Sequence, residues 1–120
     1  MRLLEYDITG GYIKTLDISR YWANGVFAIN DMIYLINYAS ETDNGQYHIF
    51  KIDNNGNLKD KYLEFDKKYR NTPHLKAYSE VNHVFSLCMS PVNEIYRIDS
   101  ISCQLAYRVN FVNKNLPEKY

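Results

Sequence analysis

The sequence YHIFKIDNNGNLKDKYLEF, residues 47–65, has the pattern of two β-strands joined by a glycine turn. Its first strand runs apolar, apolar, charged, apolar, aspartate, and this pattern occurs in two other places. The three copies are LLEYD at 3–7, IFKID at 49–53 and IYRID at 95–99, so their aspartates follow at intervals of 46 residues. Self-similarity sustained at this period indicates a repeat architecture.

A second set of strands repeats between these copies. Ile33-Tyr34-Leu35 corresponds to Phe85-Ser86-Leu87 at an interval of 52 residues, and the six additional residues fall in the connection at 66–73. Loops absorb insertions and strands do not, so the two sets belong to one repeating unit. A unit of about 40 to 50 residues with four strands is the size of one β-propeller blade. The class predicted is therefore all-β, with antiparallel four-stranded blades.

The period divides the 120 residues into about two and a half blades. We expect a half blade at 2–18, full blades at 25–65 and 73–111, and a tail at 112–120, all within a single propeller-type domain. The segment 19–24 has room for one helical turn, and no long helix is predicted. The ten expected strands are 2–8, 12–18, 26–30, 32–39, 47–53, 58–65, 74–81, 83–90, 94–100 and 105–111.

The strand MIYLINYA at 32–39 is apolar on both of its faces, so it should be covered on both sides. Propellers need at least four blades to close, and two and a half blades form only an incomplete propeller. The outer blades of such a fragment leave apolar faces and sheet edges bare. We therefore expect either self-association or contact with the remaining blades of a longer propeller.

The overall composition excludes several functional classes. Fourteen basic and fourteen acidic residues cancel, which gives no global field to attract nucleic acid or anionic lipid. Cys88 and Cys103 make neither a disulfide framework nor a zinc site, and free, half-buried thiols are expected. No apolar run reaches the length of a membrane span, and the N-terminus has no signal-peptide pattern. As written, the chain is expected in the cytoplasm.

The repeat and the segment at 95–120, IYRIDSISCQLAYRVNFVNKNLPEKY, resemble six-bladed β-propeller proteins of Bacteroides-type bacteria. These are uncharacterised domains distantly similar to propellers of the NHL type. The resemblance implies a fold and leaves the activity open. Its members commonly carry an export or lipoprotein signal, so a periplasmic or cell-surface location is the expectation if this chain is a piece of an exported member. The positions that carry the resemblance are Ile95, Tyr96, Tyr107, Val109, Phe111, Leu116 and Pro117.

The aspartates at 7, 53 and 99 could suggest a metal site or acid–base chemistry. Each one, however, stands at the end of a strand just before a turn, where such side chains accept hydrogen bonds from their own backbone. The three histidines are scattered and lack the spacing of metal ligands. We therefore expect turn-capping aspartates, no metal, no cofactor and no catalytic residue.

Aromatic residues near loops are the best binding candidates, because aromatic plates suit sugar rings or peptides. The alternative is that these rings pack between blades. The candidates are Tyr21, Trp22, Tyr38, Tyr69 and His74, of which the histidine lies in a loop beside Pro73.

The sequence thus favours a non-catalytic propeller-type scaffold, or a module that binds a ligand or protein. The ligand would be a carbohydrate or a peptide held by loops at one end of the blades. The alternatives are part of a propeller enzyme, a hydrolase or lyase with its site at the blade axis, and a truncated segment without an independent role.

Overall fold

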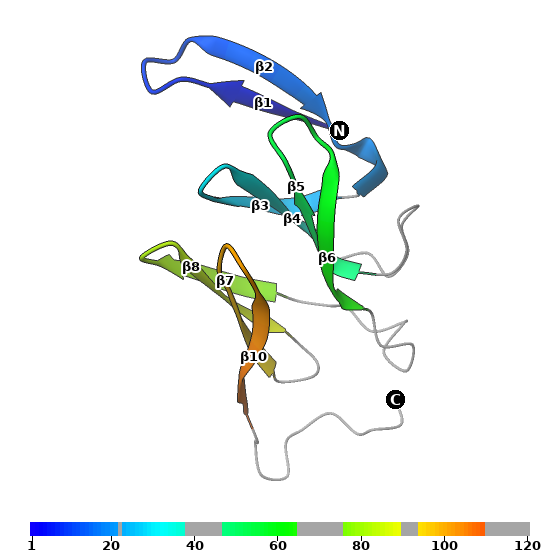
Figure 1. Ribbon diagram of the computed structural model, residues 1–120, viewed down its shortest axis with the longest axis vertical. Helices are drawn as coiled ribbons and strands as arrows, with labels where there is room; N and C mark the ends of the chain where they lie inside the picture. Colours follow the sequence, from blue (N-terminus) through cyan, green and yellow to red (C-terminus); the bar gives the residue numbers. More distant parts are fainter. Residues whose placement is uncertain (22, 38–46, 65–75, 90–93, 110–120) are drawn as a thin grey trace.

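The computed structural model describes residues 1–21, 23–37, 47–64, 76–89 and 94–109. This part of the chain consists of β-strands and one short 3₁₀ helix, η1, at Ser19–Tyr21 (Figure 1). The strands form one two-stranded and two four-stranded antiparallel sheets. The sheets are β1–β2, β3–β4–β5–β6 and β7–β8–β9–β10, with strands β1 Arg2–Tyr6, β2 Tyr12–Asp17, β3 Ala23–Ile29, β4 Met32–Asn37, β5 Tyr47–Ile52, β6 Leu58–Glu64, β7 Lys76–Val81, β8 Val84–Met89, β9 Glu94–Ile98 and β10 Cys103–Arg108.

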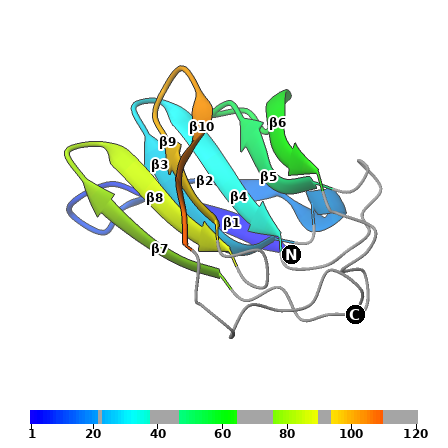
Figure 2. The same ribbon diagram turned by 90° about the horizontal axis from the view of Figure 1, so that it is seen from below.

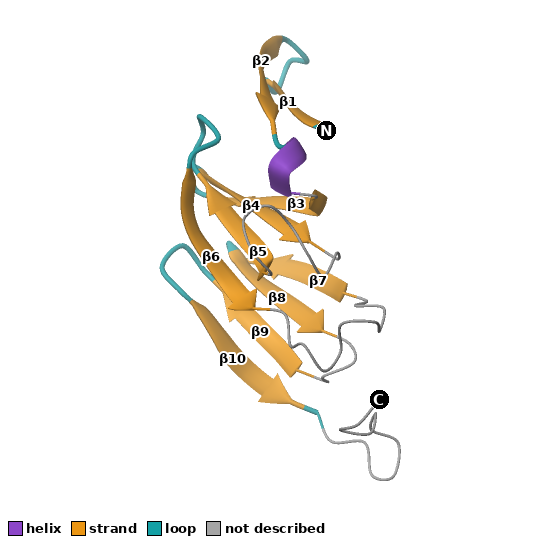
Figure 3. Cartoon of the chain, turned by 90° about the vertical axis from the view of Figure 1, so that its right-hand side faces the viewer, coloured by secondary structure: helices purple, strands orange, loops and turns teal. Residues whose placement is uncertain are grey.

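The three sheets are stacked along the longest axis of the molecule, which measures 52 Å (Figure 1). Figure 2, which looks along this axis from below, shows the sheets overlapping one another. The helix η1 connects the β1–β2 hairpin to β3 (Figure 3). This is the expected all-β arrangement of antiparallel blades in an incomplete propeller, with two complete four-stranded blades and one two-stranded half.

Two layers of apolar side chains hold the stack together, and the middle sheet contributes to both. One layer lies between the β1–β2 hairpin and the middle sheet and includes Leu35 and Phe50. The other lies between the middle and last sheets and includes Tyr34, Ile36 and Phe85. Burial of apolar surface is the main stabilising contribution, so the middle sheet is stabilised from both sides.

The strand β4 alternates between these two layers. Tyr34, Leu35 and Ile36 are each fully buried although they follow one another in sequence. Because successive side chains in a strand point to opposite faces, the strand must be covered on both sides. The expectation of two-sided cover for this apolar strand is thereby confirmed over the residues that the structure describes.

Several strand limits differ from the expected ones. The strand β3 begins at Ala23 instead of Val26, because Ala23 pairs with Asn37 across an irregularity in register. The strand β10 begins at Cys103 instead of Leu105, because Cys103 pairs with Ile98. The division into 2–18, 25–65, 73–111 and a tail at 112–120 stays a prediction at its limits, since 65, 73–75 and 110–120 lie outside the described residues.

Candidate functional site

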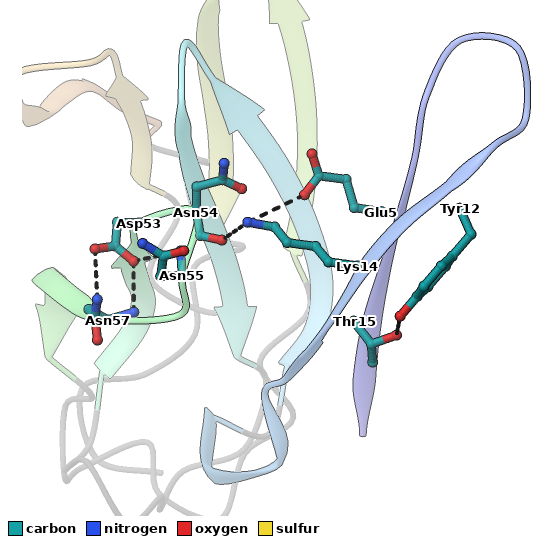
Figure 4. Close-up of polar contacts among 8 residues, drawn as sticks. All are labelled: Glu5, Tyr12, Lys14, Thr15, Asp53, Asn54, Asn55 and Asn57. Carbon is teal, nitrogen blue, oxygen red and sulfur yellow. Dashed lines mark hydrogen bonds and ion pairs between the residues drawn. The ribbon is translucent and has the colours of Figure 1, made fainter.

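The turn between β5 and β6 is organised by the carboxylate of Asp53. This group accepts hydrogen bonds from the backbone N–H groups of Asn55 and Asn57, each at 2.9 Å, and from the side-chain amide of Asn57 at 3.0 Å (Figure 4). These donors, the Asn57 side chain first, lower the pKa of Asp53 from 3.8 to about 2. The carboxylate is ionised at neutral pH, and Lys59 on β6 lies 3.5 Å from it.

The aspartates of the other two copies have the same role. Asp7 accepts hydrogen bonds from the backbone N–H groups of Thr9 at 2.9 Å and Gly11 at 2.8 Å. Asp99 accepts one from the backbone N–H of Ser102 at 2.8 Å. The pKa of Asp7 is lowered chiefly by the Thr9 hydroxyl, which donates to it at 2.6 Å, and that of Asp99 by the backbone N–H groups of Ile101 and Ser102. The expected capping role of all three aspartates is confirmed.

A lysine from the preceding sheet contacts the Asp53 turn. The ammonium of Lys14, on β2, donates a hydrogen bond to the carbonyl oxygen of Asn54 and lies 3.8 Å from the Glu5 carboxylate (Figure 4). Lys14 therefore joins the first hairpin to the middle sheet.

Side chains of the middle sheet contact the turn of the last sheet in a similar way. Lys51 on β5 donates to the carbonyl oxygen of Ser100 at 3.0 Å, and the Tyr34 hydroxyl donates to that of Asp99 at 3.2 Å. At both boundaries, side chains of one sheet thus hold the turn of the next.

The boundary between β1–β2 and the middle sheet also contains a cavity of about 470 Å³. It opens between the first hairpin and the β3–β4 hairpin. Its polar lining comes from Glu5, Asn54 and the β3–β4 turn, while most of its wall is apolar. The apolar residues that line it are Leu3, Leu4, Leu16, Val26, Phe27, Ala28, Met32 and Ile33. A concave apolar site with a few polar groups is suited to binding.

Of the predicted binding residues, the structure describes only Tyr21. Its side chain is 1% exposed, and its ring lies 5.2 Å from that of Phe50, centre to centre. The Arg20 guanidinium lies 4.8 Å from the ring centre, and the hydroxyl donates to the Gly56 carbonyl oxygen at 3.4 Å. Tyr21 thus packs between sheets in this structure, and its part in binding stays a prediction. The other four candidates, Trp22, Tyr38, Tyr69 and His74, lie outside the described residues.

The thiols differ from each other in exposure. Both are free, but Cys88 is exposed instead of half-buried as expected, whereas Cys103 is partly buried. Burial raises the pKa of the Cys103 thiol to about 11, so this group is protonated at neutral pH. Across the residues described, no three His, Cys, Asp or Glu side chains are grouped closely enough to hold a metal ion. Within the same part of the chain, no helix has the length and apolar character of a membrane span.

Sequence reasoning missed the cavity, although the repeat contained a signal for it. The first copy has the outer pair of strands, equivalent to β5–β6, without the inner pair equivalent to β3–β4. A space beside the inner strands of the next sheet follows from that difference.

Comparison with known proteins agrees with the architecture. Residues 1–119 match the family described as DUF5128, 6-bladed beta-propeller. Neither a curated protein nor a solved structure gives a significant match. Because the match extends over nearly the whole sequence and the sheets have the form of blades, the chain belongs to this 6-bladed beta-propeller family.

Proposed function

We propose that the protein is a non-catalytic propeller-type scaffold that binds polypeptide through its bare sheet faces. One comparison carries this proposal. Leu4 and Tyr6 on β1 are 51% and 55% exposed, whereas their equivalents in the next copy, Phe50 and Ile52, are fully buried. The same apolar pattern is therefore covered in one blade and uncovered in the preceding one.

The opposite end of the stack has the same property. Tyr107 on β10 is 60% exposed and lies opposite Ile95, on the face of the last sheet that points away from the middle sheet. Exposed apolar side chains gathered on a sheet favour contact with other polypeptide. The partners we propose are further blades of the propeller or a second copy of the chain, and a carbohydrate or peptide is the proposed ligand at the blade ends.

The chemistry of the titratable groups supports a role in binding over one in catalysis. General acid–base catalysis works best with a pKa near the ambient pH. Here the repeated carboxylates have lowered pKa values and are used in turns, while burial, as the main cause, raises the pKa of Tyr96 to about 12. The pKa values of the aspartates are thus moved further below neutral pH, and that of Tyr96 further above it. We also propose a cytoplasmic location for the chain as written. If the chain is a piece of an exported protein of Bacteroides type with NHL-like repeats, the proposed location is the periplasm or the cell surface.

Light scattering over a range of protein concentrations tests the proposal. We expect a solution mass above the 14.2 kDa of one chain. The variants Tyr6→Glu and Tyr107→Glu place a charge on each bare face and should return the mass to that of one chain. A control, Ile8→Glu, changes a fully exposed side chain of the β1–β2 turn and should leave the mass unchanged. A monodisperse monomer at all concentrations would contradict binding through these faces. Turnover of a hydrolase or lyase substrate by that monomer would favour an enzyme.

A further inference from the structure

A second pocket lies where the end of β2 and the helix η1 face the β5–β6 turn. It has a volume of about 410 Å³ and shares only Leu16 with the cavity beside β3 and β4. A concave site of this volume has room for one small molecule. Apart from Leu16, the pocket is lined by Asp17, Ser19, Arg20, Asn55 and Gly56.

The guanidinium of Arg20 supplies the positive charge of this lining, and it is held in place. One of its N–H groups donates to the Tyr21 hydroxyl at 2.6 Å, and its central carbon lies 4.8 Å from the centre of the Tyr21 ring. Tyr21 is itself fixed, because it is 1% exposed and its hydroxyl donates to the Gly56 carbonyl oxygen. Arg20 makes no ion pair with the residues that the structure describes. Its remaining N–H groups are therefore open to an anion.

The charges of the pocket favour a carboxylate over other anions. A guanidinium stacked on an aromatic ring matches a planar carboxylate, which accepts two parallel hydrogen bonds from it. A phosphate with two negative charges is less well suited, because the carboxylate of Asp17 lines the same pocket and like charges repel. The Ser19 hydroxyl, as the first cause, lowers the pKa of Asp17, so this carboxylate is ionised at neutral pH.

The other polar groups of the pocket suit hydroxyl groups. One oxygen of Asp17 accepts hydrogen bonds from the backbone N–H of Ser19 at 3.0 Å and from its hydroxyl at 2.6 Å. The second oxygen accepts none within the described part of the chain. The side-chain amide of Asn55 makes none there either, since only its backbone N–H is bonded, to Asp53. A ligand with donors for Asp17 and acceptors for Asn55 beside a carboxylate is a polyhydroxylated acid.

We propose that this pocket binds a sugar carboxylate, the uronate unit of an acidic saccharide. Arg20 would bind the carboxylate, Asp17 and Asn55 would bond the ring hydroxyls, and Leu16 would contact the apolar face of the ring. This inference rests on the proposed binding function and deepens it, since it gives the ligand at the blade ends a chemical class and a place. It uses no residue of the bare sheet faces, so the two can be tested separately.

Methyl β-D-glucuronide and methyl β-D-glucoside are the probes, because they differ only in carrying a carboxylate or a hydroxymethyl group. Two-dimensional NMR spectra of the isotope-labelled full chain report binding through the amide signals of Asn55 and Gly56. We expect saturable shifts with the glucuronide at a Kd of about 1 mM, and at least about tenfold weaker binding of the glucoside. Equal affinity for both sugars, or no shift with the glucuronide, would overturn the proposal.

Substitutions of Arg20 test the role of the guanidinium. Arg20→Gln should weaken glucuronide binding about tenfold, and Arg20→Lys about threefold, since lysine keeps the charge and loses the bidentate geometry. The matched control, Arg97→Gln, removes the same charge from an exposed position of β9 outside the pocket and should leave the affinity unchanged. An equal loss in the two glutamine variants would reduce the effect to overall charge and overturn the site.

Other ligands separate the proposal from its alternatives. Acetate and inorganic phosphate should each bind at least about fivefold more weakly than the glucuronide. If acetate binds equally well, the ring hydroxyls are not recognised, and if phosphate binds more tightly, the pocket is a general anion site. Tighter binding of N-acetyl-aspartate amide would assign the pocket to peptides. Each of these three results overturns the proposal.

Light scattering on the same samples separates this inference from the proposed function. A chain that self-associates but does not bind the glucuronide overturns the sugar site alone. A chain that stays monomeric and binds the glucuronide contradicts contact through the bare faces and supports the sugar site. If circular dichroism shows a folded chain with neither property, both fail.

Discussion

The two boundaries of the middle sheet have the same repeat on both sides but differ in how completely they are closed. Between the middle and last sheets, the inner strands meet and Phe27 stacks on Phe85. Between the first hairpin and the middle sheet, the hairpin has no inner pair of strands to cover β3 and β4 among the described residues, and a cavity of about 470 Å³ remains beside them. The sequence pattern of a blade therefore determines which strands it forms. How far its apolar side chains are buried, and so how much they stabilise the fold, depends on the neighbouring blade.

Truncation at the equivalent inner positions should show the largest difference between the two boundaries. Phe85→Ala removes a buried, stacked ring, so we expect the free energy of unfolding to fall by about 3–4 kcal/mol. Ile33→Ala removes a half-buried side chain beside the cavity, and the loss should be about 1 kcal/mol. Urea denaturation followed by circular dichroism measures both values. Equal losses would mean that the cavity boundary is as closed as the other.

Removal of the Tyr34 hydroxyl tests one polar contact at the boundary between the middle and last sheets. Tyr34→Phe deletes the hydrogen bond to the Asp99 carbonyl oxygen, and we expect a loss of about 1 kcal/mol. Tyr12→Phe is the matched control, because the Tyr12 hydroxyl pairs with Thr15 on the exposed side of its own hairpin. The control should change the denaturation midpoint very little. A midpoint shift of the same size in both variants would show that the contact between sheets adds nothing.

Low pH should destabilise both boundaries, by less than the substitutions above. It acts by protonating the aspartates of the turns that side chains of the preceding sheet contact. The pKa of Asp53 is about 2 in the folded chain and 3.8 as the ordinary value, so the ionised form stabilises the fold. That stabilisation is complete above pH 3.8 and is lost as the pH falls toward 2. Melting temperatures between pH 2 and pH 7 should therefore decline at the acid end. In Asp53→Asn the decline should be shallower, and an unchanged profile in this variant would contradict the role of the carboxylate.

Much of the fold could be predicted from the sequence, because it depends on local patterns. The aspartate before each turn has donors within four residues, so its role follows from the segment alone. The apolar strand at 32–37 has no polar face, and its burial on both sides follows from that alternation. The third turn is an exception. It has no glycine, whereas the other two turns have Gly10 and Gly56 at positive φ, and it closes one residue earlier, at Ser102 instead of at the equivalents of Gly11 and Asn57.

The contacts between sheets could not be predicted in the same way. Lys14 and Lys51 both donate to a turn of the next sheet, yet they stand on non-equivalent strands, β2 and β5. Which long side chain reaches that turn depends on how the sheets are spaced and twisted. Tyr21 shows the same limit: a tyrosine beside a loop has the same sequence pattern whether its ring is buried or exposed, and only the 3₁₀ turn places it inside.

Amide hydrogen exchange of the 120-residue chain alone, under conditions where it is monomeric, tests the bladed arrangement most directly. The strands Arg2–Tyr6 and Tyr47–Ile52 are equivalent in the repeat, but among the described residues the first pairs along one edge and the second along both. The account predicts that alternate amides of β1 exchange rapidly while those of β5 stay protected along the strand. Equal protection of the two strands would contradict it, because β1 would then already have a second neighbour.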